Sequence, residues 1–338
     1  EAGRARCLGD ALDGLDALFL PKAVFVNARR LNFDNRIDLR RMENVVQIKS
    51  FSSDAEPDEI VRRVEGQEVV ILKGIPLPAD AIEQFPPSVK LIVEAGNGGY
   101  VKIDLEAARR KGIVVCNTPA NSCKAVAHLV ATFMLNFSCS MAPQLRRLAL
   151  GDNSGFGKEA AMGTQDPQFE LEGKTLGIVG GKGRIGSKVA TLARCLDMNV
   201  VISDEGDHPD LVPLEELLRT SDFVSLHCPL TPETRDIINK ERIAMMKPTA
   251  FLINTGRGQL VEETDLYEAL QAKTIAGAAL DTNDPEFCSE DSPLWKLDNV
   301  ILTPHIGWKR LESRQRTVDE VAQVISAFYS GQPINVVS

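Results

Sequence analysis

Short apolar runs alternate with charged, helix-like segments through the first third of the chain. The runs are rich in Val and Ile, and they have the length of strands that are buried on both faces. Strands that alternate with helices are typical of a parallel sheet with helices on both sides. The pattern predicts a first α/β layer with strands at 23–27, 45–48, 68–72, 90–95 and 113–116.

A second alternation follows a long helical pattern and a polar stretch. The helix is expected from about Ser122 to Phe137, and the glycine-containing stretch 151–168 is expected to form an exposed loop. Further apolar runs then predict a second parallel sheet; they read KTLGIVG, NVVIS, FVSLHC, TAFLINT, TIAGAAL and NVILTP. A last helix, from Leu311 to about Ser330, comes late enough to return to the first layer. We therefore expect the first domain to be discontinuous.

The composition is that of a globular protein with room for two cores. A chain of 338 residues, 43% of them hydrophobic, is long enough for two domains. The net charge is −9 and no block of Lys and Arg stands out, so we expect no nucleic-acid partner. The most apolar helical stretch, 125–137, contains a histidine and is too short to cross a bilayer. We therefore expect no membrane partner.

The 7 cysteines form no CxxC pair and lie near no histidine in a zinc-ligand spacing. We expect no metal site, and we expect reduced thiols in a reducing compartment. This favours a cytoplasmic location. The chain begins with Glu1 rather than Met, so an organelle lumen, after removal of a transit segment, is the alternative.

A glycine-rich turn is the strongest local signal. The apolar run 174–180 leads into Gly181-Lys182-Gly183-Arg184-Ile185-Gly186, and a helical pattern follows. Glycines at this spacing let the backbone turn tightly and approach a pyrophosphate, which then lies at the helix N-terminus. Because Gly180 adds a further glycine, the first glycine of this fingerprint is either 180 or 181.

An acidic pair follows the next strand and indicates which dinucleotide binds. Asp204 and Glu205 come directly after the run NVVIS. An acid at this point accepts hydrogen bonds from the ribose hydroxyls of adenosine and repels a 2′-phosphate. NAD is therefore favoured over NADP. The alternative is a glycine turn that binds nothing, but the strand, the helix and the acid are all in the expected order.

Several longer motifs resemble the D-isomer-specific 2-hydroxyacid dehydrogenases: GRIGSKVA, VSLHCPLTPETRDIIN, INTGRGQLVEETDLYEAL, GAALD, DSPLW and TPHIG. The resemblance runs from about Val69 to the C-terminus. It implies two doubly wound parallel-sheet α/β domains with the active site in the cleft between them. A flavodoxin-like substrate domain would comprise 1–118 plus 309–338, and a Rossmann cofactor domain would comprise 119–308. Family members are usually homodimers, so we expect a homodimer through the cofactor domain.

The resemblance also assigns the reaction to particular residues. Arg257 matches the arginine that grips the substrate carboxylate and carbonyl, and His305 matches the acid/base. The supporting acid, usually glutamate in a DVFE-like run, is Asp284 in an ungapped reading, with Glu286 as its rival. Asp281 matches the residue that holds the nicotinamide carboxamide.

Further contacts carry over from the same motifs. Those with the cofactor fall on His227, Pro229, Thr234, Thr255 and Gly256, with His305 beside the nicotinamide. Those with the substrate fall on Asn97 and Gly98, together with Arg257 and His305. The loop that holds Asn97, residues 94–104, is one residue longer than the usual pattern.

The chemistry of the side chains supports these roles independently. Reduction of a 2-keto acid needs a hydride donor, a cation for the carboxylate and a proton donor near the ketone oxygen. Arg257 offers a planar fork that suits a carboxylate, and His305 can exchange a proton near neutral pH. Both follow predicted strands, where ligands bind in open α/β sheets. A surface arginine and a loop histidine are the alternative interpretations.

The other histidines are expected to have lesser roles. His128 is expected to pack within its apolar helix, and His208 to be solvated in a polar turn. His227 is expected to contact the cofactor through its main chain more than through its ring.

The predicted function is NAD-dependent interconversion of a small 2-keto acid and its D-2-hydroxy acid. The motif HIGW and the late segments SRQR and PINVV favour the glycerate dehydrogenase branch, which includes hydroxypyruvate and glyoxylate reductases. The alternative is a corepressor-like protein that senses NAD(H) on the same scaffold with little turnover, because a scaffold does not by itself impose catalysis.

Overall fold

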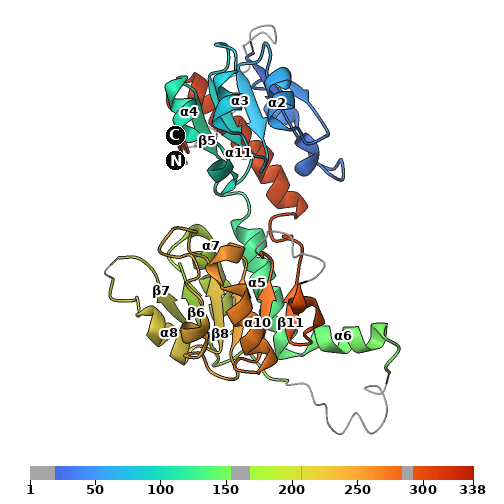
Figure 1. Ribbon diagram of the computed structural model, residues 1–338, viewed down its shortest axis with the longest axis vertical. Coiled ribbons are helices and arrows are strands. Elements are labelled where there is room, and N and C mark those ends of the chain that lie inside the picture. The colour runs from blue at the N-terminus through green and yellow to red at the C-terminus, as the bar shows by residue number, and fades with distance from the viewer. Residues whose placement is uncertain (1–19, 154–167, 207, 284–291) are drawn as a thin grey trace, which may run out of the picture. The chain divides into compact units, whose positions relative to one another are not determined.

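The chain divides into two compact units (Figure 1). The computed structural model describes residues 20–153, 168–206, 208–283 and 292–338. Unit 1 comprises Glu1–Asn121 and Leu311–Ser338, and unit 2 comprises Ser122–Arg310. Each unit is built on its own parallel sheet. The predicted pair of parallel-sheet α/β domains is confirmed.

The sheet of unit 1 has the strand order β2-β1-β3-β4-β5 and is parallel throughout. This is the order of flavodoxin-like doubly wound folds. The strands are short, and β3 and β4 are buried along their whole length, which explains why both have apolar sequences apart from Glu94 at the end of β4. They are β1 (Lys22–Phe25), β2 (Gln47–Ser50), β3 (Val69–Leu72), β4 (Leu91–Glu94) and β5 (Val114–Asn117).

Helices pack around this sheet, and the last helix of the chain is one of them. Helix α11 contacts β4 and α1. Its buried Arg314 donates to the carbonyl of Leu31 and pairs with Asp34 at 2.6 Å. The helical elements of unit 1 are η3 (Ala28–Arg30), α1 (Arg40–Glu43), α2 (Pro57–Arg63), α3 (Ala79–Glu83), η4 (Gly99–Lys102), α4 (Leu105–Arg110) and α11 (Leu311–Tyr329).

The sheet of unit 2 has the order β11-β10-β9-β8-β6-β7, again parallel. Outside β7, Leu211 forms a single parallel bridge with Ile202, and the N–H of Val212 donates to the carbonyl of Ile202 at 2.9 Å. The bridge stands where a Rossmann sheet has its third strand. The strands are β6 (Thr175–Val179), β7 (Asn199–Ser203), β8 (Phe223–Leu226), β9 (Phe251–Asn254), β10 (Gly277–Leu280) and β11 (Val300–Leu302).

The two faces of this sheet carry separate cores. On β9, Phe251 and Ile253 pack with α5 and α7, whereas Leu252 packs with the α8 and α10 side. This alternation follows from the two-residue period of a strand. The helical elements are α5 (Cys123–Ser138), α6 (Met141–Ala149), α7 (Arg184–Cys195), α8 (Leu214–Thr220), α9 (Lys240–Ile243), η7 (Gly258–Leu260), α10 (Glu263–Gln271) and η8 (Pro293–Lys296).

Helix α5 exposes part of its surface and buries the rest. His128 is exposed, so the prediction that it packs within the helix is wrong: it lies on the outer side of a helix whose other side fills the core. Within the described ranges, no single helix is long and apolar enough to cross a membrane. Helices α5 and α6 together have sufficient length and apolar character, but the pair is bent by 73°.

Candidate active site

The predicted site residues of unit 2 lie at one edge of its sheet. The strands are parallel, so their carboxyl ends meet at the same edge, where open α/β sheets bind their ligands. Each strand is followed by at least one candidate: Gly181 after β6, Asp204 after β7, His227 after β8, Arg257 after β9, Asp281 after β10 and His305 after β11.

The glycine-rich turn leaves no room for side chains at three of its positions. Gly180 has φ +80°, and a Cβ there would lie 2.5 Å from the nitrogen of Cys228. A Cβ on Gly181 would press into β7 at 2.6 Å, and one on Gly186 would lie 2.5 Å from the carbonyl oxygen of Gly180. Gly183 is the N-cap of α7. The bare backbone is therefore open to a close approach by a ligand.

Helix α7 begins directly after this turn, with Arg184 as its first residue. Arg184 is exposed and Ile185 is half-buried. The helix is 12 residues long, and the first N–H groups of an α-helix have no partner within the helix. The N-terminus of α7 therefore favours an anion such as a pyrophosphate.

Asp204 lies beside the same turn. Its Oδ2 accepts the N–H of Lys182 at 2.7 Å, and its Oδ1 accepts the N–H of Glu205 at 2.9 Å. The carboxylate is thus oriented by two backbone donors while it stays partly exposed. A carboxylate in this place can accept hydrogen bonds from ribose hydroxyls and repels a 2′-phosphate.

His227 is held by the protein rather than presented to a ligand. Its Nε2 lies 2.8 Å from Ser225 Oγ, and within the described structure its buried Nδ1 has no hydrogen-bond partner. Burial lowers the pKa of His227 to about 4. The ring is therefore neutral at pH 7 and cannot serve as the general acid.

The loop after β8 is closed by a threonine. Thr234 Oγ1 donates to the carbonyl of Pro229 and accepts the N–H of Thr231, both at 2.7 Å. These bonds fix the main chain of the segment that follows His227. Pro229 itself is exposed.

Arg257 lies in a short turn that the side chain of a neighbouring asparagine stabilises by hydrogen bonds. Asn254, the last residue of β9, donates to the carbonyl of Arg257 at 2.7 Å and accepts the N–H of Gly256 at 3.0 Å. Arg257 Nη1 donates to the carbonyl of Gly256 at 2.9 Å. Thr255 is buried between them, and no hydrogen-bond partner of its hydroxyl is found in the described structure. The sequence analysis missed Asn254, although the motif INTGRG contains it.

Asp281 fastens the turn that carries His305. Asp281 is 2% exposed; its Oδ1 accepts the Thr303 hydroxyl at 2.6 Å and the N–H of Ile306 at 2.8 Å. Its Oδ2 accepts the N–H of Gly307 at 2.9 Å. Charge-assisted bonds of this kind are about twice as strong as neutral ones. This fastening is a second task for Asp281 that the resemblance did not imply.

The backbone at His305 is in the left-handed region, with φ +49°. A non-glycine residue there costs of order 1 kcal/mol and persists only where its surroundings impose it. The three bonds to Asp281 supply that constraint. A Cβ on Gly307 would lie 3.0 Å from Asp281 Oδ2, which explains the glycine in the motif HIG.

The substrate candidates of unit 1 lie in the loop after β4. Asn97 is exposed; its carbonyl accepts Asn117 Nδ2 at 2.8 Å. The carbonyl of Gly96 accepts the N–H of Thr118 at 3.1 Å. Among the described residues, no acceptor is found for the N–H groups of Asn97 and Gly98. The loop therefore offers backbone donors to a ligand.

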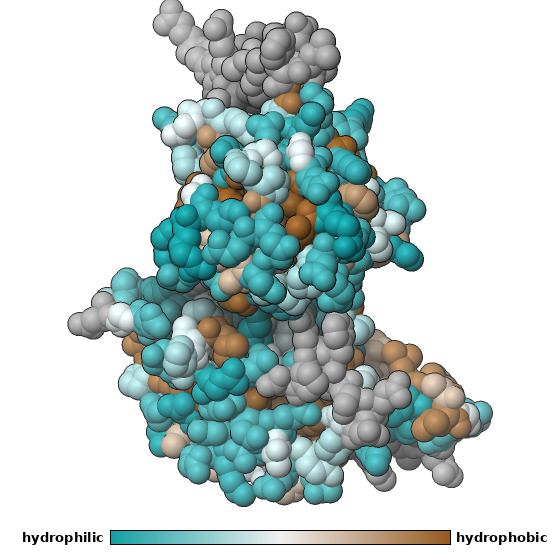
Figure 2. Space-filling model, turned by 45° about the horizontal axis from the view of Figure 1, so that its top comes forward, coloured by the Kyte–Doolittle hydropathy of each residue, from teal (hydrophilic) through white to brown (hydrophobic). Residues whose placement is uncertain are grey.

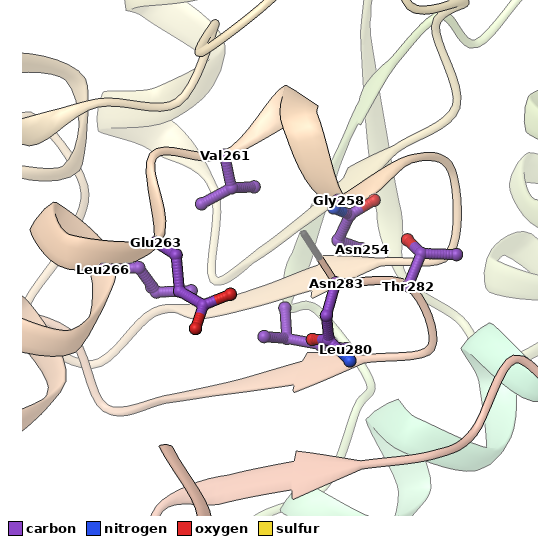
Figure 3. Close-up of a pocket in the computed structure, with 8 residues that line it drawn as sticks. All are labelled: Asn254, Gly258, Val261, Glu263, Leu266, Leu280, Thr282 and Asn283. Atoms are coloured by element: carbon purple, nitrogen blue, oxygen red, sulfur yellow. The ribbon is translucent and has the colours of Figure 1, made fainter. Parts of the chain in front are cut away.

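A small cavity beside the end of β10 is not a substrate pocket. It measures about 10 Å³, room for one water molecule (Figure 3). Glu263, Thr282 and Asn283 are among the residues that line it. Thr282 Oγ1 and Asn283 Oδ1 are buried and without partners in the described part of the chain, so a water molecule fits their chemistry.

Comparison with known proteins identifies the family. The chain matches the NAD binding domain model of the D-isomer specific 2-hydroxyacid dehydrogenases over residues 138–307. It is 34% identical over 324 residues to the glycerate dehydrogenase of Methylorubrum extorquens, covering 94% of this chain and 98% of that protein. It is 34% identical over 288 residues to the hydroxypyruvate reductase of Blautia hydrogenotrophica, covering 83% and 88%. The chain belongs to the D-isomer-specific 2-hydroxyacid dehydrogenases.

A solved structure supports the same assignment. The NAD-complexed D-isomer specific 2-hydroxyacid dehydrogenase of Lactobacillus delbrueckii has a TM-score of 0.78 and 26% identity, over 94% of this chain and 100% of that chain. The cofactor of this dehydrogenase is NAD. The chain's own geometry fits it, because Gly180, Gly181 and Gly186 leave a bare backbone cradle and Asp204 lies beside it.

The acid that supports His305 stays a prediction for this dehydrogenase. Asp284 and its rival Glu286 both lie outside the described residues. The buried Asp281 lies just before them and is bound to the His305 turn.

No group of three His, Cys, Asp or Glu side chains that could hold a metal is found in the described part of the chain.

Proposed function

We propose that this NAD-dependent dehydrogenase interconverts glyoxylate or hydroxypyruvate and the corresponding 2-hydroxy acid. The observation that carries the proposal is that Arg257 and His305 follow strands at the same edge of the sheet. Each lies in a turn that a buried side chain stabilises by hydrogen bonds. The names of relatives such as glycerate dehydrogenase and hydroxypyruvate reductase support the substrate class. The small residues of the 96–99 loop, Gly96-Asn97-Gly98-Gly99, suit a short keto acid.

Each residue has a defined part in this reaction. The Arg257 guanidinium binds the substrate carboxylate and carbonyl through parallel N–H groups. The N–H groups of Asn97 and Gly98, for which no acceptor is found among the described residues, bind the carboxylate as well. Protonated His305 donates its proton to the ketone oxygen as the oxygen gains charge, and neutral His305 takes it back in the reverse direction. When bound, NADH would supply the hydride for the reduction.

We also propose that the two units bind different ligands. Residues 1–118 plus 309–338, whose bounds lie within three residues of those of unit 1, serve as the substrate domain, and 119–308 as the cofactor domain. The remaining cofactor contacts are proposed for the segments that follow β8 and β9; they are His227, Pro229, Thr234, Thr255 and Gly256. For His227 the main chain is proposed, since the ring nitrogens are buried or hydrogen-bonded.

The decisive experiment is NADH oxidation with a panel of 2-keto acids. The kcat/KM for glyoxylate and hydroxypyruvate should be higher than that for branched and aromatic keto acids. Arg257→Lys should lose roughly a hundredfold or more, because an ammonium cannot reproduce the bidentate fork. Tight NADH binding with no turnover of any keto acid would instead indicate the corepressor-like alternative, which the enzyme names of the relatives do not favour.

The supporting acid can be identified in the same assay. We propose Asp284, with Glu286 as the alternative. An anion beside an imidazolium stabilises the protonated form, so its removal should move the alkaline limb of the reduction profile to lower pH by about one unit or more. Asp284→Asn should show this movement and Glu286→Gln should not. The opposite result would assign the role to Glu286.

We further propose that the enzyme is a homodimer through helix α6 of unit 2. None of the nine residues of α6 is buried, and Met141, Leu145 and Leu148 are 46%, 56% and 40% exposed. Leu150, just after the helix, is 80% exposed. Apolar side chains gather at this end of unit 2 in the space-filling view (Figure 2). Exposed apolar patches of this kind mark interaction surfaces.

The oligomeric state tests the dimer directly. Sedimentation analysis should give the mass of two chains, and Leu145→Glu should shift it toward one chain because a charge would enter the apolar face. Replacement of a polar surface residue, such as Lys188→Glu on α7, serves as the control. A monomeric mass for the unaltered protein would contradict the proposal.

A further inference from the structure

A buried carboxylate lies beneath the 96–99 loop of unit 1. Glu94 is the last residue of β4 and is 1% exposed. Its Oε1 and Oε2 both accept the N–H of Gly74, at 3.0 and 3.2 Å. A carboxylate loses its hydration when it is buried, so this one must be held by its surroundings.

The loop is shaped around this carboxylate. A Cβ on Gly99 would overlap Glu94 Oε1, and a Cβ on Gly96 would lie 3.1 Å from the same atom and 2.8 Å from Lys73 Nζ. Glu94 therefore lies against both ends of the 96–99 loop. It also connects this loop to Gly74, which follows β3.

Three cations in the described part of the chain act on Glu94, and they come from three segments. They are Lys73 after β3, Lys102 in η4 and Arg30 in η3. Arg30 and Lys102 both donate to the carbonyl of Gly74, and Arg30 is also paired with Asp54 at 2.7 Å. From β5, the register partner of Glu94 is the uncharged Asn117.

Burial and these cations act on Glu94 in opposite directions. Burial raises the pKa of Glu94 to about 7, and the nearby Lys73, the Gly74 N–H, Lys102 and Arg30 keep it from rising further. The carboxyl group is therefore close to half protonated at neutral pH. Either form can keep an acceptor oxygen on the N–H of Gly74.

We propose that Glu94 is a positioning residue that couples anion binding at the 96–99 loop to the uptake of a proton. The inference rests on the proposed function, in which this loop binds the substrate carboxylate. An anion at the loop repels the carboxylate beneath it and so favours its neutral form. Protonation then removes the repulsion while the bond from Gly74 keeps the Glu94 side chain beneath the loop. The surrounding cations are left to attract the bound anion.

The test measures proton uptake on binding of oxalate to the NADH-loaded enzyme. Calorimetry in buffers of different ionisation enthalpy gives the number of protons bound. Between pH 7 and 8 the unaltered enzyme should take up about half to one proton more than Glu94→Gln, and from pH 6 to 8 its Kd for oxalate should rise about tenfold more than that of the variant. Glu106→Gln, an exposed acid on α4, is the matched control and should behave as the unaltered enzyme.

A second variant separates Glu94 from the general acid. His305 exchanges protons as well, so His305→Asn should keep the additional uptake, and the double variant with Glu94→Gln should lose it. If Glu94→Gln folds poorly, proton uptake by His305→Asn alone still tests the inference, because this variant retains Glu94. Loss of all pH-linked uptake in His305→Asn would overturn the inference.

Failure of the inference and failure of the proposed function give different results. Equal proton uptake in Glu94→Gln and the unaltered enzyme, with turnover of keto acids intact, overturns the inference alone. Absence of both oxalate binding and turnover overturns the proposed function and the inference with it.

Discussion

In each unit a buried carboxylate at a strand end shapes a loop, but the two carboxylates are held differently. Asp281 in unit 2 accepts bonds from a hydroxyl and two backbone N–H groups. Glu94 in unit 1 accepts one backbone N–H and otherwise faces cations. Bonds to oriented neutral donors fix a backbone turn, whereas cations balance a charge without fixing geometry. We therefore expect Asp281 to act as an anchor and Glu94 to respond to protons.

The largest expected effect comes from Asp281→Asn. An amide keeps only one acceptor oxygen, so its NH2 group must face either the Gly307 N–H or the Thr303 and Ile306 donors, which leaves a donor of the His305 turn unpaired. A buried donor that is left without a partner costs about 1–3 kcal/mol. Urea unfolding should show a loss of this order, and kcat/KM should fall more than a hundredfold. Unchanged activity would show that the turn holds His305 without Asp281.

Glu94→Gln should have the next largest effect, and with the opposite sign. A carboxyl whose pKa is about 7 in the folded protein and 4.5 when free binds its proton more tightly when folded. Its contribution to stability is present below pH 4.5 and is lost as the pH rises to 7. Relative to the unaltered enzyme, the variant should therefore gain up to about 3 kcal/mol between pH 4.5 and 7.

Urea unfolding across this pH range provides the measurement. Glu106→Gln is the control, since its carboxylate is exposed on α4, and its curve should run parallel to that of the unaltered enzyme. A parallel curve for Glu94→Gln as well would mean that Glu94 does not titrate in this range. The contrast with Asp281 would then disappear.

Two glycine replacements compare the loops at a smaller scale. A Cβ at residue 99 would overlap Glu94 Oε1, whereas one at residue 307 would lie 3.0 Å from Asp281 Oδ2. Gly99→Ala should therefore destabilise the protein by about 1–3 kcal/mol and raise KM more than it lowers kcat. Gly307→Ala should instead lower kcat, because it displaces the turn of the general acid. Steady-state kinetics of both variants provide the measurement. A main effect of Gly99→Ala on kcat and of Gly307→Ala on KM would contradict these roles.

Asp204→Ala should have the smallest effect on the fold. Its carboxylate is partly exposed and orients only the N–H groups of Lys182 and Glu205. Stability should change by less than about 0.5 kcal/mol. The ratio of kcat/KM for NADH to that for NADPH should nevertheless fall about tenfold, since the acid that favours NADH is gone. A native preference for NADPH would contradict the assignment.

Local patterns in the sequence predicted much of the fold. Apolar runs of strand length placed every strand of both sheets to within a few residues, because burial on both faces leaves a continuous signal. The glycine turn and Asp204 were equally readable, since the turn, the helix and the acid are close in the chain. The reduced third strand of unit 2, a single bridge between Ile202 and Leu211, was not predicted.

The positions of the buried carboxylates were decided only by the tertiary structure. Asp281 meets Thr303, and Glu94 meets Gly74, because β10 pairs with β11 and β3 pairs with β4. Strand pairing is set by the packing of the whole sheet, and no short window of sequence contains both partners of such a contact. The direction of a side chain at a strand end also depends on the twist and on the loop that follows. Residue types and their order therefore predicted which groups are present, and the sheets determined which of them meet.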